Sequence, residues 1–112
     1  MENHKLVLPE HLNQYGFLFG GYLLMWVDEI AWISASLEFP DCHFVTVGMD
    51  RVEFRKSVRT GSILTFETEQ TGKGNTSVTY SVVVRRESEV IFSTCVTLVR
   101  VDDRGDKTAL PD

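Results

Sequence analysis

The sequence predicts an α+β domain in which a curled antiparallel sheet wraps around one long buried helix. Residues 20–37 (GGYLLMWVDEIAWISASL) form a long apolar stretch, interrupted by two adjacent carboxylates, two serines and the opening glycines. Four segments rich in Val, Thr, Phe and Ile then follow without a second helical stretch. Because helix and strands are segregated along the chain rather than alternating, an antiparallel sheet is favoured over a parallel one.

Residues 20–37 are the one predicted helix. At 1.5 Å per residue this helix would be about 27 Å long, which is nearly enough to cross a bilayer. Asp28 and Glu29 lie at its centre, and charges at that depth are costly in lipid. A helix that is apolar on almost every side is instead expected to be surrounded by protein.

Five segments are predicted to form the sheet. They are a short run, Lys5–Leu8, which Pro9 ends, and the longer segments His43–Arg55, Ile63–Thr71, Thr76–Arg86 and Val90–Val101. Apolar and polar residues alternate in several of them, as expected of strands with one buried face. The separators 59–61, 72–75 and 87–89 are predicted to be hairpin connections. Residues 102–106 are predicted to form a turn before a loose C-terminus.

The length of the chain sets its expected organisation. With 112 residues it can build one hydrophobic core and not two, so a single domain over residues 1–112 is expected. A sheet wrapped around one helix still has edge strands that need covering, and the rest of the chain is too short to cover them. Pairing with a second copy solves this, so we expect a homodimer or a higher multiple of dimers, such as a tetramer or a hexamer.

Composition narrows the possible partners. A net charge of −5 argues against a nucleic-acid binder, since that class relies on clustered Lys and Arg. Residues 1–19 lack the apolar core of a secretory signal, so we expect a soluble cytoplasmic protein with no membrane partner. Cys42 and Cys95 have no metal-ligand spacing and are too few for a disulfide framework. We expect both thiols to be reduced and packed, and no metal to be bound.

Asp28 and Glu29 are the first candidates for chemistry. They lie in the most apolar segment of the chain, where burying a carboxylate is costly unless hydrogen bonds compensate. Buried ionisable groups in a small protein are candidates for a functional site. The alternative is that one acid pairs with a neighbouring strand and the other reaches solvent. Helical periodicity does not choose between the two acids, because adjacent positions differ by about 100° around a helix.

The start of the helix is a second candidate site. Gly20 and Gly21 begin the helix, and Asn13 and Gly16 lie in the loop before it. The free N–H groups of a first turn point outward with the positive end of the helix dipole, so they can hold an anion or a developing oxyanion. The alternative, which spacing alone favours, is a plain glycine-rich loop with an asparagine in a turn.

Two further groups could contact an anionic ligand. Residues 72–77 (GKGNTS) combine glycines, one cation and several hydroxyl or amide groups, which suits either a phosphate or a simple tight turn. The densest basic cluster consists of Arg51, Arg55, Lys56 and Arg59. Strand alternation is expected to leave several of these four side chains in solvent.

The string from Asn13 to Gly21 (NQYGFLFGG), followed by Asp28, resembles the hotdog-fold acyl-CoA thioesterases, in particular the bacterial short-chain and the cytosolic acyl-CoA hydrolases. Their pattern runs from an Asn through a Gly and an aromatic or aliphatic stretch into Gly-Gly and an Asp in the helix. The resemblance continues through the segments 45–46, 52–54, 61, 74–77 and 99–102, and it covers the chain from residue 10 to residue 111. Two positions depart from the pattern: residues 55–58 lack a proline that is often present, and Ser62 stands where an acid is common.

The resemblance implies a hotdog fold and hydrolysis of an acyl-CoA to a free acid and CoA, without metal or organic cofactor. It implies that Asp28 is the catalytic carboxylate, that Asn13 of the neighbouring chain is its partner, and that a backbone amide near Gly21 polarises the carbonyl. The substrate-binding residues assigned on this basis are Gly20, Thr46, Arg55, Gly74, Thr76 and Ser77. Gly74 and Ser77 fall in the hairpin where the family places the CoA phosphates. Whether Asp28 acts as a general base or as a nucleophile stays open.

Two other functions are compatible with this fold. One is a non-catalytic acyl-CoA sensor, because fold alone does not settle function. The other is a dehydratase or hydratase, which normally needs a catalytic His. His4, His11 and His43 show no paired spacing, and none lies near Asp28 in the sequence, so this function is disfavoured.

The length of the acyl chain is left open by the sequence. Four aromatic residues, Tyr22, Trp26, Trp32 and Phe39, are bulky enough to shorten an acyl tunnel. Aromatic residues at helical spacing are more commonly part of a core, so these four could equally be structural.

Overall fold

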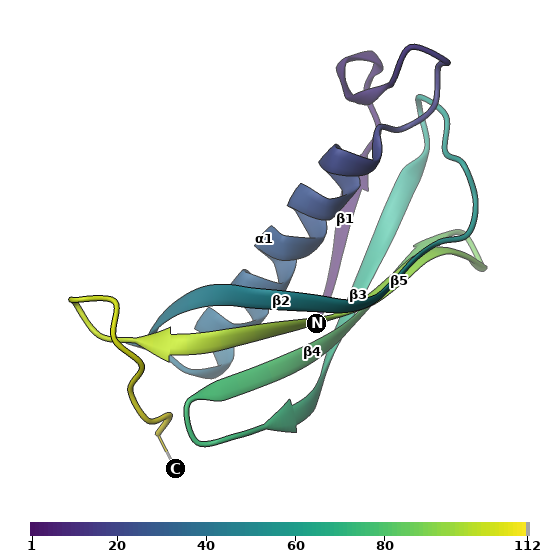
Figure 1. Ribbon diagram of the computed structural model, residues 1–112. Helices are drawn as coiled ribbons and strands as arrows, with labels where there is room; N and C mark the ends of the chain where they lie inside the picture. The colour runs from purple at the N-terminus through teal and green to yellow at the C-terminus, as the bar shows by residue number, and fades with distance from the viewer. Residues whose placement is uncertain (112) are drawn as a thin grey trace.

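The computed structural model describes residues 1–111 and shows one long helix lying against a five-stranded antiparallel sheet (Figure 1). The elements in chain order are β1 (Glu2–Leu6), a short 3-10 helix η1 (Pro9–His11), α1 (Gly20–Glu38), β2 (His43–Phe54), β3 (Ile63–Lys73), β4 (Ser77–Arg86) and β5 (Glu89–Val101). The predicted α+β class is therefore confirmed. The predicted helix and the four long strands are present with ends shifted by one or two residues, and the short first strand lies earlier than predicted.

The strand order corrects one prediction. The order is β1-β3-β4-β5-β2, so β2 pairs with β5 and not with β3. Residues 59–61 consequently do not form a hairpin; they belong to a connection that carries the chain from β2 across to β3. Val58 anchors this connection, because its side chain is 2% exposed and its carbonyl accepts a hydrogen bond of 2.7 Å from the N–H of Leu18. The separators between β3 and β4 and between β4 and β5 do join paired neighbours.

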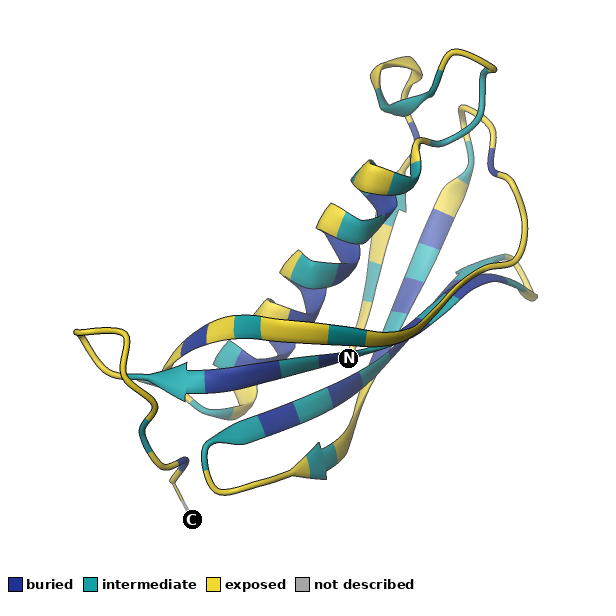
Figure 2. Cartoon of the chain, viewed as in Figure 1, coloured by how far each residue is buried: buried dark blue, intermediate teal, exposed yellow. Residues whose placement is uncertain are grey.

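The hydrophobic core lies between α1 and the sheet. The helix buries one face made of Leu23, Trp26, Val27, Ile30, Ala31, Ser34 and Ala35. Strands β4 and β5 alternate buried and half-buried residues along most of their length, as strands at the centre of a sheet do (Figure 2). In residues 1–111, no helix is both long and apolar enough to cross a membrane.

Strand β2 is an open edge of the sheet. Most of its residues are exposed, including the apolar side chains of Val45, Val47, Val52 and Phe54 (Figure 2). Its pairing with β5 is interrupted twice, between Thr46 and Gly48 and between Asp50 and Glu53. A long apolar edge that is not paired is an association surface, because its backbone groups and side chains gain by being covered.

The C-terminal segment is held in place, so the predicted loose end is wrong for residues 107–111. Residues 102–106 form the predicted turn, in which the N–H of Asp102 donates to the carbonyl of Asp106 at 2.8 Å. The chain then returns to the sheet, where Leu110 is buried and its N–H donates to the carbonyl of Asn75 at 2.8 Å. The prediction of a single domain over residues 1–112 stays a prediction, and Asp112 lies outside the described residues.

Candidate active site

Asp28 is half-buried on the side of α1 that faces β2. The hydroxyl of Thr46 on β2 donates a hydrogen bond to Asp28 Oδ1 at 2.5 Å. This bond replaces part of the hydration that the carboxylate loses in its apolar surroundings. It also fixes the side chain, because Thr46 belongs to a strand paired with β5. Thr46, which the sequence assigned to substrate binding, therefore contacts the candidate catalytic carboxylate directly.

Glu29, the neighbouring acid, points toward the other edge of the sheet. Its Oε1 lies 3.9 Å from Lys5 Nζ on β1, and both side chains are substantially exposed. The two adjacent acids are thus turned toward the two edge strands, Asp28 toward β2 and Glu29 toward β1. The alternative, in which one acid pairs with a neighbouring strand and the other reaches solvent, also describes these contacts, because Asp28 bonds to Thr46 on β2 and Glu29 is largely exposed.

Asn13 closes the loop that precedes α1. Its side-chain oxygen accepts hydrogen bonds from the N–H groups of Tyr15 (2.9 Å) and Phe17 (3.1 Å), and its own N–H donates to Phe17 O at 2.7 Å. Gly16 completes the turn with a φ of 84°, a backbone conformation that favours glycine. Because the side-chain oxygen is already engaged, the group that Asn13 has to offer a ligand is its NH₂, a hydrogen-bond donor.

The N-terminus of α1 presents unengaged backbone donors. The N-cap residue, Phe19, makes no side-chain cap, and the first helical bonds run from Tyr22 N (3.1 Å) and Leu23 N (3.4 Å) to Phe19 O. Within residues 1–111 the N–H groups of Gly20 and Gly21 have no acceptor. Close contacts explain both glycines: a Cβ on Gly21 would lie 2.7 Å from the Phe19 ring, and a Cβ on Gly20 would lie 3.3 Å from the Phe54 ring.

These groups form two separate half-sites in one chain. Asp28 follows Gly20 by eight residues, which places it about 12 Å further along the helix axis. Asn13 lies in the loop between η1 and the N-terminus of α1, and Figure 1 shows this loop at the N-terminal end of the helix. No hydrogen bond within residues 1–111 joins Asp28 to Asn13, Gly20 or Gly21. One half-site therefore holds Asp28 with Thr46, and the other holds Asn13 with the two glycine amides.

The structure separates the residues that were assigned to substrate binding. Gly74, Thr76 and Ser77 lie together in the β3–β4 turn, where Gly74 N donates to Ser77 O at 2.8 Å. Gly74 is tightly fitted there, since a Cβ would lie 2.8 Å from Ser77 Oγ. Arg55 is not part of this group. It follows the far end of β2, and its Nη2 lies 3.5 Å from Glu53 Oε1 and 3.4 Å from Ser93 Oγ.

The remaining candidates are accounted for by local contacts. His11 accepts a hydrogen bond from Leu8 N at 3.0 Å and packs against Trp26, and none of the three histidines contacts Asp28 in the described chain. Cys42 and Cys95 are free, half-buried thiols. Over residues 1–111 there is no group of three or more His, Cys, Asp or Glu side chains that could hold a metal ion.

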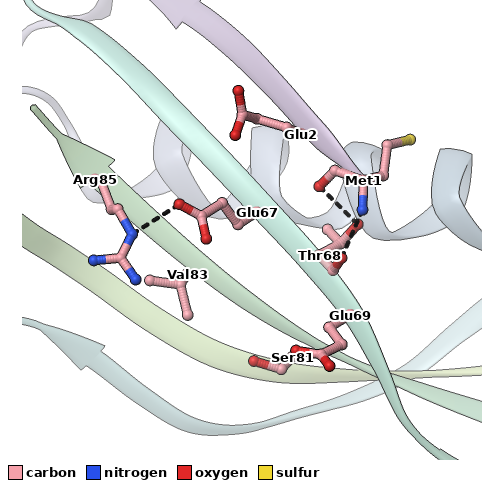
Figure 3. Close-up of a pocket in the computed structure, with 8 residues that line it drawn as sticks. All are labelled: Met1, Glu2, Glu67, Thr68, Glu69, Ser81, Val83 and Arg85. Atoms are coloured by element: carbon pink, nitrogen blue, oxygen red, sulfur yellow. Dashed lines mark hydrogen bonds and ion pairs between the residues drawn. The ribbon is translucent and has the colours of Figure 1, made fainter. Parts of the chain in front are cut away.

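A hollow on the sheet surface beside β1 lies apart from both half-sites (Figure 3). It is lined by Met1, Glu2, Glu67, Thr68, Glu69, Ser81, Val83 and Arg85. Several of its charged groups pair with neighbours: Arg85 Nε donates to Glu67 at 2.8 Å, and the Met1 ammonium donates to Thr68 O at 2.7 Å. None of the residues proposed for chemistry lines this hollow, so it contributes nothing to the candidate site.

Comparison with known sequences finds enzymes of one type. The family model described as the thioesterase superfamily matches residues 15–92. Acyl-coenzyme A thioesterase 11 of Mus musculus is 33% identical over 97 residues, which cover 84% of this chain and 16% of that protein. An uncharacterized acyl-CoA thioester hydrolase of Bacillus subtilis is 31% identical, over 94% of this chain and 64% of that protein. The chain thus spans less than two thirds of the length of these relatives.

Comparison with solved structures gives whole-chain matches. A hexameric thioesterase from Yersinia pestis superposes with a TM-score of 0.92 at 28% identity, over 98% of this chain and 93% of that one. A hexameric hotdog-fold thioesterase of Campylobacter jejuni gives 0.85 at 28% identity, over 97% and 88%. An acyl-CoA hydrolase from Staphylococcus aureus, solved with butyryl-CoA and CoA, gives 0.86 at 29% identity, over 99% and 68%. The predicted hotdog fold is therefore confirmed.

Proposed function

Because this chain belongs to the thioesterase superfamily, we propose that it is an acyl-CoA thioester hydrolase, which converts an acyl-CoA and water to a free acid and CoA. The observation that carries the proposal is the half-buried carboxylate of Asp28, which the Thr46 hydroxyl holds in a helix made mostly of apolar residues. The acyl-CoA thioesterases among its relatives, and the Staphylococcus aureus hydrolase that was solved with butyryl-CoA, support this substrate class.

Asp28 supplies the basic oxygen for the reaction. Thr46 occupies Oδ1, which leaves Oδ2 to face the substrate. Acting as a general base, Oδ2 takes a proton from water while the water oxygen bonds to the thioester carbon; the C–S bond then breaks and the CoA sulfur receives the proton. Acting as a nucleophile, Oδ2 itself bonds to that carbon, CoA leaves, and water hydrolyses the resulting anhydride. Both routes use the same carboxylate and give the same products.

The second half-site stabilises the charge that develops on the carbonyl oxygen. The N–H groups of Gly20 and Gly21 stand at the positive end of the α1 dipole and have no acceptor within residues 1–111. The Asn13 NH₂ adds a donor beside them, because its own oxygen is bound to the loop backbone. In this role Asn13 donates to the thioester oxygen or positions the water through that water's oxygen.

A dimer joins the two half-sites. If β2 pairs with β2 of a second copy around a two-fold axis, the open edge is covered and the two α1 helices run antiparallel beside each other. The N-terminus of each helix then lies alongside the middle of its neighbour. Asp28 of one chain then lies beside Asn13, Gly20 and Gly21 of the other. Within a single chain, Asp28 and the two glycines are about 12 Å apart along the helix, so one chain alone does not bring them together.

Substitutions made in a relative support the choice of Asn13, Asp28 and Thr46 as site residues. The Staphylococcus aureus hydrolase has been solved with an asparagine, an aspartate or a threonine replaced by alanine. Its substituted asparagine and aspartate are fifteen positions apart, which is also the spacing of Asn13 and Asp28. Its substituted threonine follows the aspartate by seventeen positions, against eighteen between Asp28 and Thr46. These three residue types at nearly these spacings are the ones that the site described above uses.

The proposal extends to CoA binding, assembly and location. We assign the CoA phosphates to the turn that contains Gly74, Thr76 and Ser77, with Arg55 as a separate contact at the other end of β2. The hexameric thioesterases that share this fold favour assembly of dimers into a hexamer. Similarity to the human cytosolic acyl-CoA thioester hydrolase, 30% identical over 70% of this chain, favours a cytoplasmic location.

The test is an assay of free thiol release from acetyl-, butyryl-, decanoyl- and palmitoyl-CoA, with Asp28→Asn as the inactive control. We expect the wild type to hydrolyse at least one of these substrates. The variant should hydrolyse it about 10²–10⁴-fold more slowly, as expected when a general base is removed. The variant should still bind acyl-CoA. Binding of acyl-CoA by the wild type without hydrolysis of any chain length would instead identify a sensor and overturn the proposal.

A further inference from the structure

Trp32 is the one aromatic residue among the four acyl-tunnel candidates of α1 and its C-cap that stays outside the core. Trp26 is buried, and Tyr22 and Phe39 pack against the buried cluster. Trp32 is 45% exposed. It follows Asp28 by one helical turn, so both residues lie on neighbouring parts of the same helix face.

Two parallel contacts fix Trp32 and Asp28 along the seam between α1 and β2. The Trp32 indole N–H donates to Phe44 O at 3.1 Å, and Asp28 accepts from Thr46. Four residues of helix rise about 6 Å and two residues of strand about 7 Å, so the two contacts are in register. The indole is therefore held beside the carboxylate rather than swinging freely in solvent.

The seam is closed beyond Trp32. Ser36, one turn further along α1, has a buried hydroxyl oxygen that finds no partner in residues 1–111. Phe39 and Phe44 pack together after it, with ring centroids 6.1 Å apart. Along this face of α1, the half-exposed Trp32 ring therefore lies between Asp28 and the covered residues beyond it. CoA must emerge into solvent from the site, so a closed end suits the acyl group and not the CoA arm.

We infer that Trp32 is the end wall of the acyl-binding groove and sets the upper limit on acyl length; this inference rests on the proposed function. Trp32 follows Asp28 by one helical turn, about 6 Å along the axis, so an acyl chain that runs from Asp28 toward the C-terminal end of α1 meets the ring after a few carbons. The enzyme accordingly prefers short acyl-CoAs. Replacing the ring by a small side chain opens the groove toward Ser36 and admits longer chains.

The experiment compares kcat/KM for acetyl-, butyryl-, hexanoyl- and decanoyl-CoA in the wild type and in Trp32→Leu, Trp32→Ala and Trp32→Phe. We expect the decanoyl to butyryl ratio to rise at least tenfold in the Leu and Ala variants, since each methylene that gains or loses room changes kcat/KM by about 10-fold or more. Trp32→Phe keeps a ring without the indole N–H and should keep the short-chain order. Leu37→Ala is the matched control, because Leu37 is exposed and lies about 180° around the helix from Asp28.

Calorimetric titration of the same acyl-CoAs into Asp28→Asn and Asp28→Asn/Trp32→Leu separates the inference from the proposed function. A chain-length preference in binding that Trp32→Leu relaxes supports the wall even if no hydrolysis is found. An unchanged acyl profile in Trp32→Leu overturns the inference while hydrolysis by the wild type keeps the function. If Trp32→Leu weakened the binding of all acyl-CoAs and of free CoA equally, the inference would also be overturned, because the ring would then contact the CoA arm and not the acyl chain.

Discussion

The two faces of α1 differ in how completely other parts of the same chain cover them. The face toward the sheet is filled by residues such as Val27 and Ile30, whose side chains are fully buried. The face around Asp28 borders the open strand β2, and it leaves Met25 and Trp32 about half exposed. Folding of the single chain buries the first face. The second face leaves apolar surface and the Asp28 carboxylate accessible to a ligand or to a second chain. Stability is therefore expected to depend on the first face, and activity on the second.

The largest effect on stability is expected from Ile30→Ala on the buried face. Removing a large buried side chain leaves a cavity and should lower the free energy of unfolding by about 2–5 kcal/mol. Met25→Ala on the open face is the matched comparison and should cost well under half as much in an isolated chain. Urea denaturation followed by circular dichroism measures both. Equal losses would mean that the two faces are equally packed and would remove the contrast.

Thr46→Val should reduce kcat about tenfold with a smaller change in KM. The substitution keeps the side-chain volume and removes the hydrogen bond to Asp28, which costs about 1.5–3 kcal/mol when a charged group is involved. Thr46→Ser keeps a hydroxyl and should restore most of the rate. Steady-state kinetics on the best acyl-CoA gives both numbers. A rise in KM alone would assign Thr46 to substrate binding, as the sequence had suggested.

Tyr80→Phe should change how stability depends on pH. Burial, and then the hydrogen bond to Glu38 at 2.7 Å, raise the pKa of Tyr80 above its ordinary value of 10.0. The protonated phenol therefore stabilises the fold below pH 10, and this contribution is lost as the pH rises above 10. Thermal melts between pH 7 and 11 should show a steeper decline for the wild type than for the variant, which also loses about 1 kcal/mol at neutral pH. Parallel curves would contradict this.

The smallest effect is expected at Glu29, the acid next to the proposed catalytic residue Asp28. Its pair with Lys5 spans 3.9 Å between exposed side chains. Glu29→Gln should change the free energy of unfolding by less than about 0.5 kcal/mol and leave turnover within twofold of wild type. Kinetics and denaturation on the purified variant check this. A tenfold loss of turnover would show that Glu29 takes part in the reaction, which contradicts its assignment to a surface ion pair.

Local patterns predicted most of the fold, and long-range pairing limited the rest. The apolar run at residues 20–37 predicted the helix, and the alternation of apolar and polar residues predicted the strands, because the spacing of apolar residues reflects which face of an element is buried. The pairing of β2 with β5 depends on contacts far apart in sequence, so the turn-like residues 59–61 were mistaken for a hairpin. The C-terminal segment is held by the carbonyl of Asn75, a contact to which no local signal points.

The candidate site shows the same limit. Helical periodicity could not separate Asp28 from Glu29, and only the resemblance to a family chose Asp28. The structure distinguishes the two acids by their partners, since Thr46 bonds to Asp28 and Lys5 lies beside Glu29. The position of Trp32 outside the core depends on where the edge of the sheet falls, and the sequence left it undecided between core and acyl groove.

The central claim is that Asn13 and Asp28 act together across a dimer, and mixed dimers test it most directly. Asn13→Ala and Asp28→Ala homodimers should each be nearly inactive, because every site lacks one member. Unfolding and refolding the two variants together in equal amounts should restore roughly a quarter of wild-type activity per chain, since random pairing makes half the dimers mixed and each mixed dimer has one intact site of two. No recovery, once mass spectrometry has shown that the chains exchanged, would contradict the shared site.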